Sequence, residues 1–179
     1  MRGLILVLAL AFSGTVALAD IGWNTARMTP GSVMVLKDSD GVERMHVARG
    51  HVQGLKRFDT YAGRGAGATY LGSYLTTATG DVVRQIEFDG VVTQFAPHRC
   101  NRTLGECRYT ITHADGFVEN RVRVTRATAD GLVWQEHGLD GLMAEGAIEL
   151  DADGVAKGGW RKQKSGKKVR TKRVMIALK

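Results

Sequence analysis

The chain has 179 residues but only two prolines and two cysteines. With so little proline and a hydrophobic fraction of 44%, the composition argues against a disordered chain. Beyond the first 19 residues there is no long apolar run, whereas a membrane-spanning helix needs about 20 apolar residues. We therefore expect a folded domain without a transmembrane anchor.

The first 19 residues have the order of a secretory signal peptide. Arg2 precedes an apolar run from Leu4 to Phe12, and Ala17 and Ala19 stand at the positions of an A-x-A cleavage site. The sequence therefore predicts removal of residues 1–19 and a mature protein, residues 20–179, that is periplasmic or secreted. A chain of this length suits a single domain with one core.

Acidic residues are absent after Asp153. This last segment nevertheless holds ten of the 25 Lys and Arg residues, so the net charge of +7 belongs mainly to one C-terminal element. We expect that element to be a hairpin spanning 155–178. Its basic residues are candidates for binding an anionic partner, namely Arg161, Lys162, Lys164, Lys167, Lys168, Arg170, Lys172 and Arg173.

The chain is marked at regular intervals by Asp-Gly, a pair that suits tight hairpin turns because both residues tolerate positive φ. It occurs at 40–41, 89–90, 115–116, 130–131, 140–141 and 153–154. Between these turns lie short runs rich in Val, Ile, Thr and aromatic residues, which predict strands. The predicted strands are 31–37, 42–49, 69–77, 82–88, 91–96, 107–113, 117–126, 131–137, 146–150, 155–163 and 168–178.

This spacing predicts an all-β fold, an antiparallel meander of about ten strands. Because so many strands would otherwise leave open edges, we expect a closed or strongly curved barrel. The segments 59–68 and 138–144 are interpreted as irregular, with a short helix as an alternative around 139–145. The lipocalin group of the calycins shares such an architecture, but none of its sequence motifs occurs here, so the similarity is by analogy only.

Several predicted strands alternate with period two. Tyr109 and His113 share one face of the strand 107–113. In the strand 117–126, Val122 and Val124 lie on one face, and Arg121 and Arg123 on the other. If the aromatic faces point inward, a ligand cavity would be lined by Tyr74, Phe95, Tyr109, His113 and Trp134.

Cys100 and Cys107 are separated by six residues, next to His98. Zinc sites usually pair ligands at C-x2–4-C spacing, and redox sites favour C-x-x-C. Neither pattern fits, and two cysteines in an exported chain usually pair. We predict a structural disulfide between Cys100 and Cys107, with a metal site or free thiols as alternatives.

Motifs of catalysis are scarce. The five histidines form no HxH or HExxH spacing, and G-x-S-x-G does not occur. The glycine-rich stretch 63–68 lacks the Lys-Ser/Thr of a phosphate-binding loop. The sequence thus predicts no enzyme, no metal and no cofactor, although histidine or carboxylate chemistry stays open as an alternative.

Two functional hypotheses follow from these features. In the first, an exported, non-enzymatic binding protein of the cell envelope holds a small apolar or amphipathic ligand inside its barrel. In the second, the basic hairpin docks on an anionic envelope surface or protein. Sequence-specific recognition of nucleic acid is not expected, since the aromatic residues form no stacking row.

Overall fold

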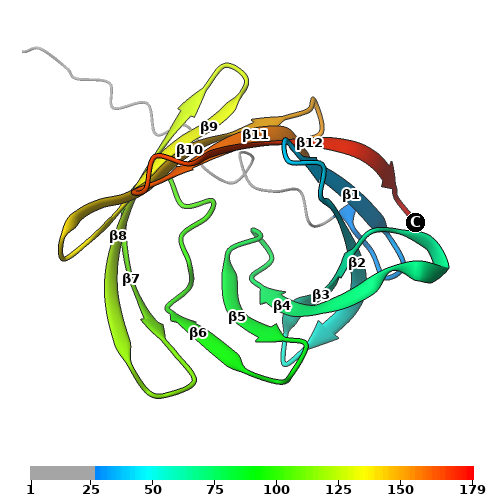
Figure 1. Cartoon of the computed structure of the whole chain (residues 1–179), viewed down its shortest axis with the longest axis horizontal. Helices are drawn as coiled ribbons and strands as arrows, with labels where there is room; N and C mark the ends of the chain where they lie inside the picture. The colour runs from blue at the N-terminus through cyan, green and yellow to red at the C-terminus, as the bar shows by residue number, and fades with distance from the viewer. Residues whose placement is uncertain (1–26) are drawn as a thin grey trace, which may run out of the picture.

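The computed structural model describes residues 27–179, which form a barrel of antiparallel strands (Figure 1). No α-helix occurs within this range, and a short 3₁₀ turn lies at Gly65–Gly67. The predicted signal peptide lies outside the described residues. The twelve strands are β1 (Val33–Asp38), β2 (Glu43–Val52), β3 (Leu55–Ala62), β4 (Thr69–Thr76), β5 (Val82–Glu87), β6 (Val92–Ala96), β7 (Gly105–Thr112), β8 (Val118–Thr128), β9 (Gly131–Gly138), β10 (Gly141–Leu150), β11 (Ala156–Gln163) and β12 (Lys168–Ala177).

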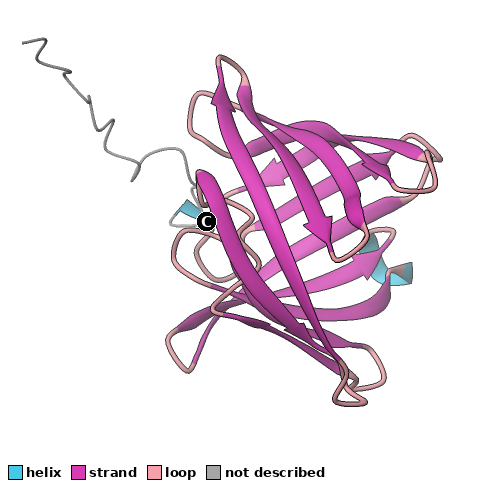
Figure 2. Cartoon of the chain, turned by 90° about the vertical axis from the view of Figure 1, so that its left-hand side faces the viewer, coloured by secondary structure: helices cyan, strands magenta, loops and turns pink. Residues whose placement is uncertain are grey.

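Every strand pairs with its neighbours in sequence, and β1 pairs with β12 to close the barrel. At the closure, Val33 of β1 lies opposite Ala177 of β12 on one side and opposite Val47 of β2 on the other. Figure 2 shows the strands running obliquely around the wall, joined by short turns at both ends. The predicted all-β meander and its closure are confirmed, with twelve strands instead of about ten. The barrel also has four more strands than the eight of a lipocalin.

The Asp-Gly pairs form turns as predicted. Gly41, Gly90, Gly116 and Gly141 all have φ between 84° and 89°, a conformation that glycine adopts without strain. At three of these turns the glycine N–H donates to the carbonyl oxygen three residues earlier, as Gly41 does to Asp38 at 3.0 Å. The turns therefore fix which strands become neighbours.

Two segments predicted to be irregular belong partly to strands. Residues 59–62 complete β3, and β10 already begins at Gly141. Residues 59–62 were predicted to be irregular partly because Asp59 begins this segment, and aspartate is uncommon in strands. Asp59 is only 7% exposed and accepts hydrogen bonds from Arg49 Nε at 2.8 Å and Arg57 Nε at 2.9 Å, which compensate its charge.

The meander gives the barrel two different ends. The turns that follow odd-numbered strands lie at one end of the barrel. The turns that follow even-numbered strands lie at the other end, where the described range also begins and ends. At this second end, the β4–β5 connection (77–81) and the β6–β7 connection (97–104) turn into the barrel interior (Figure 1). They partly fill the interior from that end.

The buried apolar side chains form two separate clusters. The first contains Met28, Met34, Ala48, Phe58 and Val155, and the second contains Phe95, Cys100 and Tyr109. Neither cluster fills the barrel. The space between them is lined by apolar side chains together with polar and charged ones, described below.

Gly131 provides a test of how tightly the strands are packed. It has a φ of 149°, and a Cβ atom there would stand 2.0 Å from the carbonyl oxygen of Ile148 on β10. We expect Gly131→Ala to lower the free energy of unfolding by about 3 kcal/mol, because β10 must shift. Urea denaturation would measure the loss.

Gly41→Ala is the matched control. Gly41 also has a positive φ, 88°, but nothing lies within 4 Å of a Cβ atom at that position. Only backbone strain remains there, and we expect a loss of about 1 kcal/mol. Equal losses in the two variants would contradict the close approach of β9 and β10.

Candidate functional site

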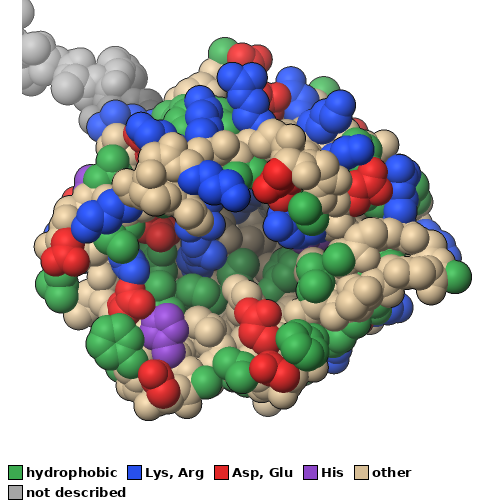
Figure 3. Space-filling view, viewed as in Figure 1, with side chains coloured by type: hydrophobic (Ala, Val, Ile, Leu, Met, Phe, Trp, Pro, Cys, Tyr) green, Lys and Arg blue, Asp and Glu red, His purple; other side chains and the backbone are tan. Residues whose placement is uncertain are grey.

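The barrel encloses a cavity of about 570 Å³. Its lining includes residues close to the turns after odd-numbered strands, such as Arg44 of β2, Glu87 of β5 and Arg161 of β11. Figure 3 shows this face of the molecule with a hollow at its centre and Lys and Arg side chains around and within it. The cavity therefore opens at this end and is closed towards the other by the inward-turned connections.

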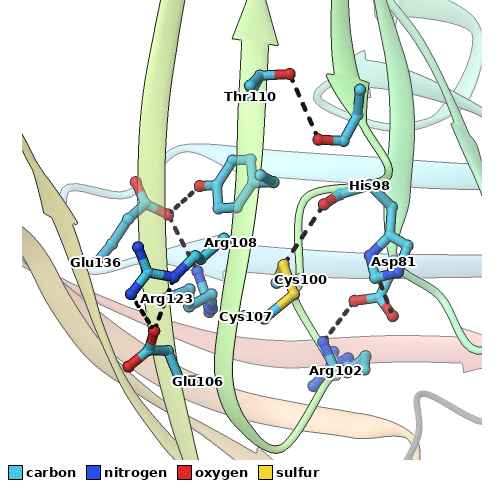
Figure 4. The surroundings of a disulfide bond; sticks show 12 residues. Asp81, His98, Cys100, Arg102, Glu106, Cys107, Arg108, Thr110, Arg123 and Glu136 are labelled. Carbon is cyan, nitrogen blue, oxygen red and sulfur yellow. Dashed lines mark hydrogen bonds and ion pairs between the residues drawn. A yellow bond between two sulfur atoms is a disulfide. The ribbon is translucent and has the colours of Figure 1, made fainter.

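The β6–β7 connection brings two arginines to the cavity. Cys100, 0% exposed, is joined by a disulfide to Cys107 on β7, with their Cα atoms 6.0 Å apart (Figure 4). The backbone N–H of Arg99 donates to the carbonyl oxygen of Val82 at 2.7 Å, and that of Arg102 to Asp81 Oδ1 at 2.6 Å. Held in this way, Arg99 and Arg102 both line the cavity.

The predicted disulfide is confirmed, which leaves no free cysteine in the described range. Its place is deeper than the sequence indicated, since Cys100 lies inside the barrel and packs against Phe95 and Tyr109. Within residues 27–179, no three His, Cys, Asp or Glu side chains are grouped so that they could hold a metal ion.

A single carboxylate, that of Glu136 on β9, lies among several cationic groups. The Tyr109 hydroxyl donates to Glu136 Oε2 at 2.7 Å, Arg123 Nη1 lies 3.4 Å from the same oxygen, and Arg99 Nη2 lies 3.8 Å from it. Burial would raise the pKa of Glu136, but Arg99, the Tyr109 hydroxyl and Arg123 outweigh it and lower that pKa below its ordinary value. Glu136 is therefore ionised at neutral pH.

Two arginines of the cavity wall, Arg102 and Arg123, are buried in a low-dielectric environment. Burial first, and repulsion from Arg123 second, lower the pKa of Arg102 to about 9. Burial, only partly offset by Glu136, lowers the pKa of Arg123 to about 10. Burial and the nearby Arg99 also lower the pKa of Arg161. Arg102, Arg123 and Arg161 remain protonated at neutral pH, so the cavity carries concentrated positive charge.

Trp134 gives this part of the wall an aromatic surface. The Arg123 guanidinium lies 3.9 Å from the centre of the Trp134 ring, a cation–π contact. Gly146 on β10 makes room for the indole, since a Cβ atom there would stand 2.7 Å from a ring carbon of Trp134. The absence of a side chain at residue 146 thus positions the Trp134–Arg123 pair.

The other side of the cavity is less charged. His46 and Tyr74 line it together, with His46 Nδ1 3.3 Å from the Tyr74 hydroxyl oxygen, and Phe58 stacks on Tyr74 with ring centres 5.2 Å apart. Burial, and then the nearby Arg44, lower the pKa of His46 to about 4, so its ring is neutral at neutral pH. Leu36 adds an aliphatic surface beside them.

The structure separates the five residues named as ligand candidates. Tyr74 and Trp134 line the cavity. Phe95 and Tyr109 lie in the second apolar cluster and do not line the cavity. The Tyr109 hydroxyl is connected to the cavity arginines by its hydrogen bond to Glu136. His113 lies near the β7–β8 turn, stacked on Phe117 and 2.8 Å from Glu119.

The basic hairpin, formed by β11 and β12, divides between inside and outside. Arg161 lines the cavity, although it is also an exposed residue, and Arg173 pairs with Asp151 at 2.7 Å. The remaining candidates are exposed, namely Lys162, Lys164, Lys167, Lys168, Arg170 and Lys172. Two of them have acidic neighbours, Glu145 at 3.3 Å from Lys162 and Asp40 at 3.9 Å from Lys167.

The enzymatic alternative required two histidines around one carboxylate. In the described part of the chain, His98 lies 3.8 Å from Asp81 and His113 lies 2.8 Å from Glu119, in different connections of the barrel. The cavity is instead suited to hold an anion beside an apolar surface.

Arg99, Arg102, Arg123 and Glu136 are not among the site residues predicted from the sequence. The alternation of Arg121 and Arg123 with valines was the one pattern that could have indicated arginines on an inward face.

Comparisons with models of known protein families, with curated proteins and with solved structures found no match. Among residues 27–179 no helix has the length and apolar character needed to cross a membrane.

Removal of the disulfide tests its role in the cavity. We expect Cys100→Ala combined with Cys107→Ala to lower the free energy of unfolding by about 2.5 kcal/mol, because the unfolded chain regains the entropy of the short loop. Urea denaturation would measure this loss. The β6–β7 connection should also become cleavable by trypsin after Arg99 and Arg102 under native conditions, whereas unchanged resistance would show that packing alone holds it.

Proposed function

We propose that the protein is an exported, non-enzymatic binding protein of the cell envelope whose barrel holds one small amphipathic ligand. The cavity of about 570 Å³ carries this proposal. Small-molecule sites usually measure about 300–1,000 Å³ and combine an apolar wall with a few convergent polar groups. The Leu36, Tyr74 and Trp134 side chains supply the first feature, and the arginines supply the second.

Export is supported by the N-terminal sequence and by the disulfide. Disulfides persist in oxidising compartments such as the bacterial periplasm or the extracellular space. The Cys100–Cys107 bond fixes the connection whose Arg99 and Arg102 line the cavity, so an oxidising environment also suits the integrity of the site.

Filling the cavity tests the proposal. Ile148 lines the cavity, whereas Val133 on the adjacent strand is 37% exposed on the outer face. We expect Ile148→Trp to abolish retention of the natural ligand and Val133→Trp to preserve it, because only the first indole occupies the cavity. Native mass spectrometry of each protein, purified from the compartment to which it is exported, would detect the bound mass.

The wild-type protein is expected to carry a mass that denaturation releases. A ligand mass retained equally by the wild type and by Ile148→Trp would place binding elsewhere on the molecule. Circular dichroism of the two tryptophan variants would confirm that both keep the β fold.

A second candidate function is docking on an anionic envelope surface, favoured by the exposed basic side chains of the hairpin, among them Lys162, Lys164, Lys167, Lys168, Arg170 and Lys172. Each Lys or Arg at an anionic bilayer contributes about 1 kcal/mol. Reversal of Lys167, Lys168 and Arg170 to Glu should therefore weaken binding to phosphatidylglycerol vesicles at least about a hundredfold. Co-sedimentation at low and high salt would measure it.

The matched control reverses three exposed basic residues outside the hairpin, Arg64, Arg108 and Arg126. Its change in net charge is the same, so an equal effect would indicate a general attraction and not docking by the hairpin. Unchanged vesicle binding after reversal in the hairpin would remove this candidate.

A further inference from the structure

The cationic wall of the cavity has more positive charge than its own carboxylates compensate. Arg99 and Arg123 share one partner, Glu136, at 3.8 and 3.4 Å. Arg161 on β11 forms no ion pair within the described residues. The charges of Arg99 and Glu136 nevertheless act on its pKa, which Arg99 lowers and Glu136 raises. Two guanidinium groups thus share one carboxylate, which also accepts the Tyr109 hydroxyl, and Arg161 lines the same cavity.

Donor atoms of these arginines are buried without a protein acceptor. The Nε atoms of Arg99 and Arg123 are inaccessible and make no hydrogen bond with the described part of the chain. A guanidinium presents five N–H donors in a rigid fork, and a buried donor without an acceptor is destabilising. A ligand cannot reach these two Nε atoms, but the uncompensated guanidinium charge of Arg99, Arg123 and Arg161 along the cavity wall favours an additional anion with several acceptor oxygens.

The other charged residues of the interior do not supply that anion. Asp38 pairs with Arg44, Glu119 with Arg121, and Asp151 with Arg173. Asp81 accepts the backbone N–H of Arg102. Glu87, which also lines the cavity, accepts a hydrogen bond from Gln85 Nε2 at 2.6 Å. Each carboxylate already has its own partner, and Glu136 alone serves the convergent arginines.

We infer that the ligand is a single-chain amphiphile whose carboxylate or phosphate head group binds to Arg99, Arg123 and Arg161. Guanidinium groups suit both head groups because their paired N–H donors match paired oxygens. The apolar chain then lies against Leu36, Tyr74 and Trp134, which line the same cavity. This inference rests on the proposed binding function and adds the chemical class of the ligand.

The Glu136 carboxylate is expected to compete with the ligand for the arginines of this site. It occupies the same guanidinium groups that a ligand head group would use, so it competes with the ligand and limits its affinity. Removal of its charge should strengthen the binding of an anionic amphiphile. A residue with only a structural role would not have this effect, because its loss leaves binding unchanged or weaker.

Titration calorimetry with matched probes tests the class of ligand. We expect decanoate to bind the wild-type protein at least about tenfold more tightly than decanol, because its charge is matched in the cavity. Decyltrimethylammonium should bind more weakly than decanol, since the arginines repel it. Acetate and inorganic phosphate test the head group alone and should bind far more weakly than decanoate.

The outcomes separate the two proposals. Equal affinity for decanoate and decanol would overturn the anionic head-group site and leave the binding function intact. Acetate or phosphate binding as tightly as decanoate would replace the amphiphile by a free anion and overturn the inference. If none of the three amphiphiles binds, the proposed binding function itself fails.

Paired variants locate the head group. Arg161→Gln should lower the affinity for decanoate about tenfold and leave that for decanol unchanged. Arg170→Gln is the control, because Arg170 is exposed on the neighbouring strand outside the cavity, and it should change neither affinity. Equal effects of the two substitutions would overturn the assignment.

Glu136→Gln should raise the affinity for decanoate and leave that for decanol unchanged, in the direction opposite to Arg161→Gln. An unchanged or lower affinity for decanoate in a folded Glu136→Gln protein would contradict the competition. If circular dichroism shows that this variant does not fold, the Arg161 and Arg170 pair decides the proposal alone.

Discussion

The pairing of β1 with β12 is the constraint from which the rest of the structure follows. Closure removes both open edges, and the diameter of a barrel grows with the number of its strands. Eight strands leave an interior that side chains can fill, whereas twelve enclose more space than the two apolar clusters occupy. The inward-turned β4–β5 and β6–β7 connections fill part of this space from one end, and the remainder is the cavity.

An interior of this width also changes which residues face inward. Several charged side chains point into it as complementary pairs, such as Arg44 with Asp38 and Arg173 with Asp151. Such pairs compensate the charges but lose hydration, so they contribute little net stability. The arginines around Glu136 differ, because their number exceeds that of the acceptors. An imbalance of this kind, retained within a well-packed wall, is more readily explained by ligand binding than by stability.

The sequence predicted the antiparallel meander but missed the strand β3, and it did not predict which face of each strand points inward. Asp-Gly turns are local signals, which is why the meander could be predicted, and the disulfide could be predicted because the chain has only two cysteines. In β8, alternation separates Val122 and Val124 from Arg121 and Arg123 but does not say which face is inside. The usual assumption places valines in the core, yet Arg123 is 3% exposed and faces the cavity. Its partner Glu136 lies on the next strand, and Arg99 reaches both from a connection that folds inward, so the site depends on tertiary contacts that no local pattern encodes.

Strand alternation also determines which basic side chains of the C-terminal segment face outward and which face the barrel interior. Along β12, Lys168, Arg170 and Lys172 are exposed on the outer face, while the alternate residues Thr171 and Arg173 point inward. A single run of basic sequence thus contributes positive charge to two surfaces separated by the barrel wall. Because the wall keeps them apart, a change on the outer face alters attraction to anionic surfaces without changing the hydrogen bonds of the cavity. Arg161 is the member of the hairpin that belongs to the cavity, and for this reason the charge of the segment cannot be assigned to one function as a whole.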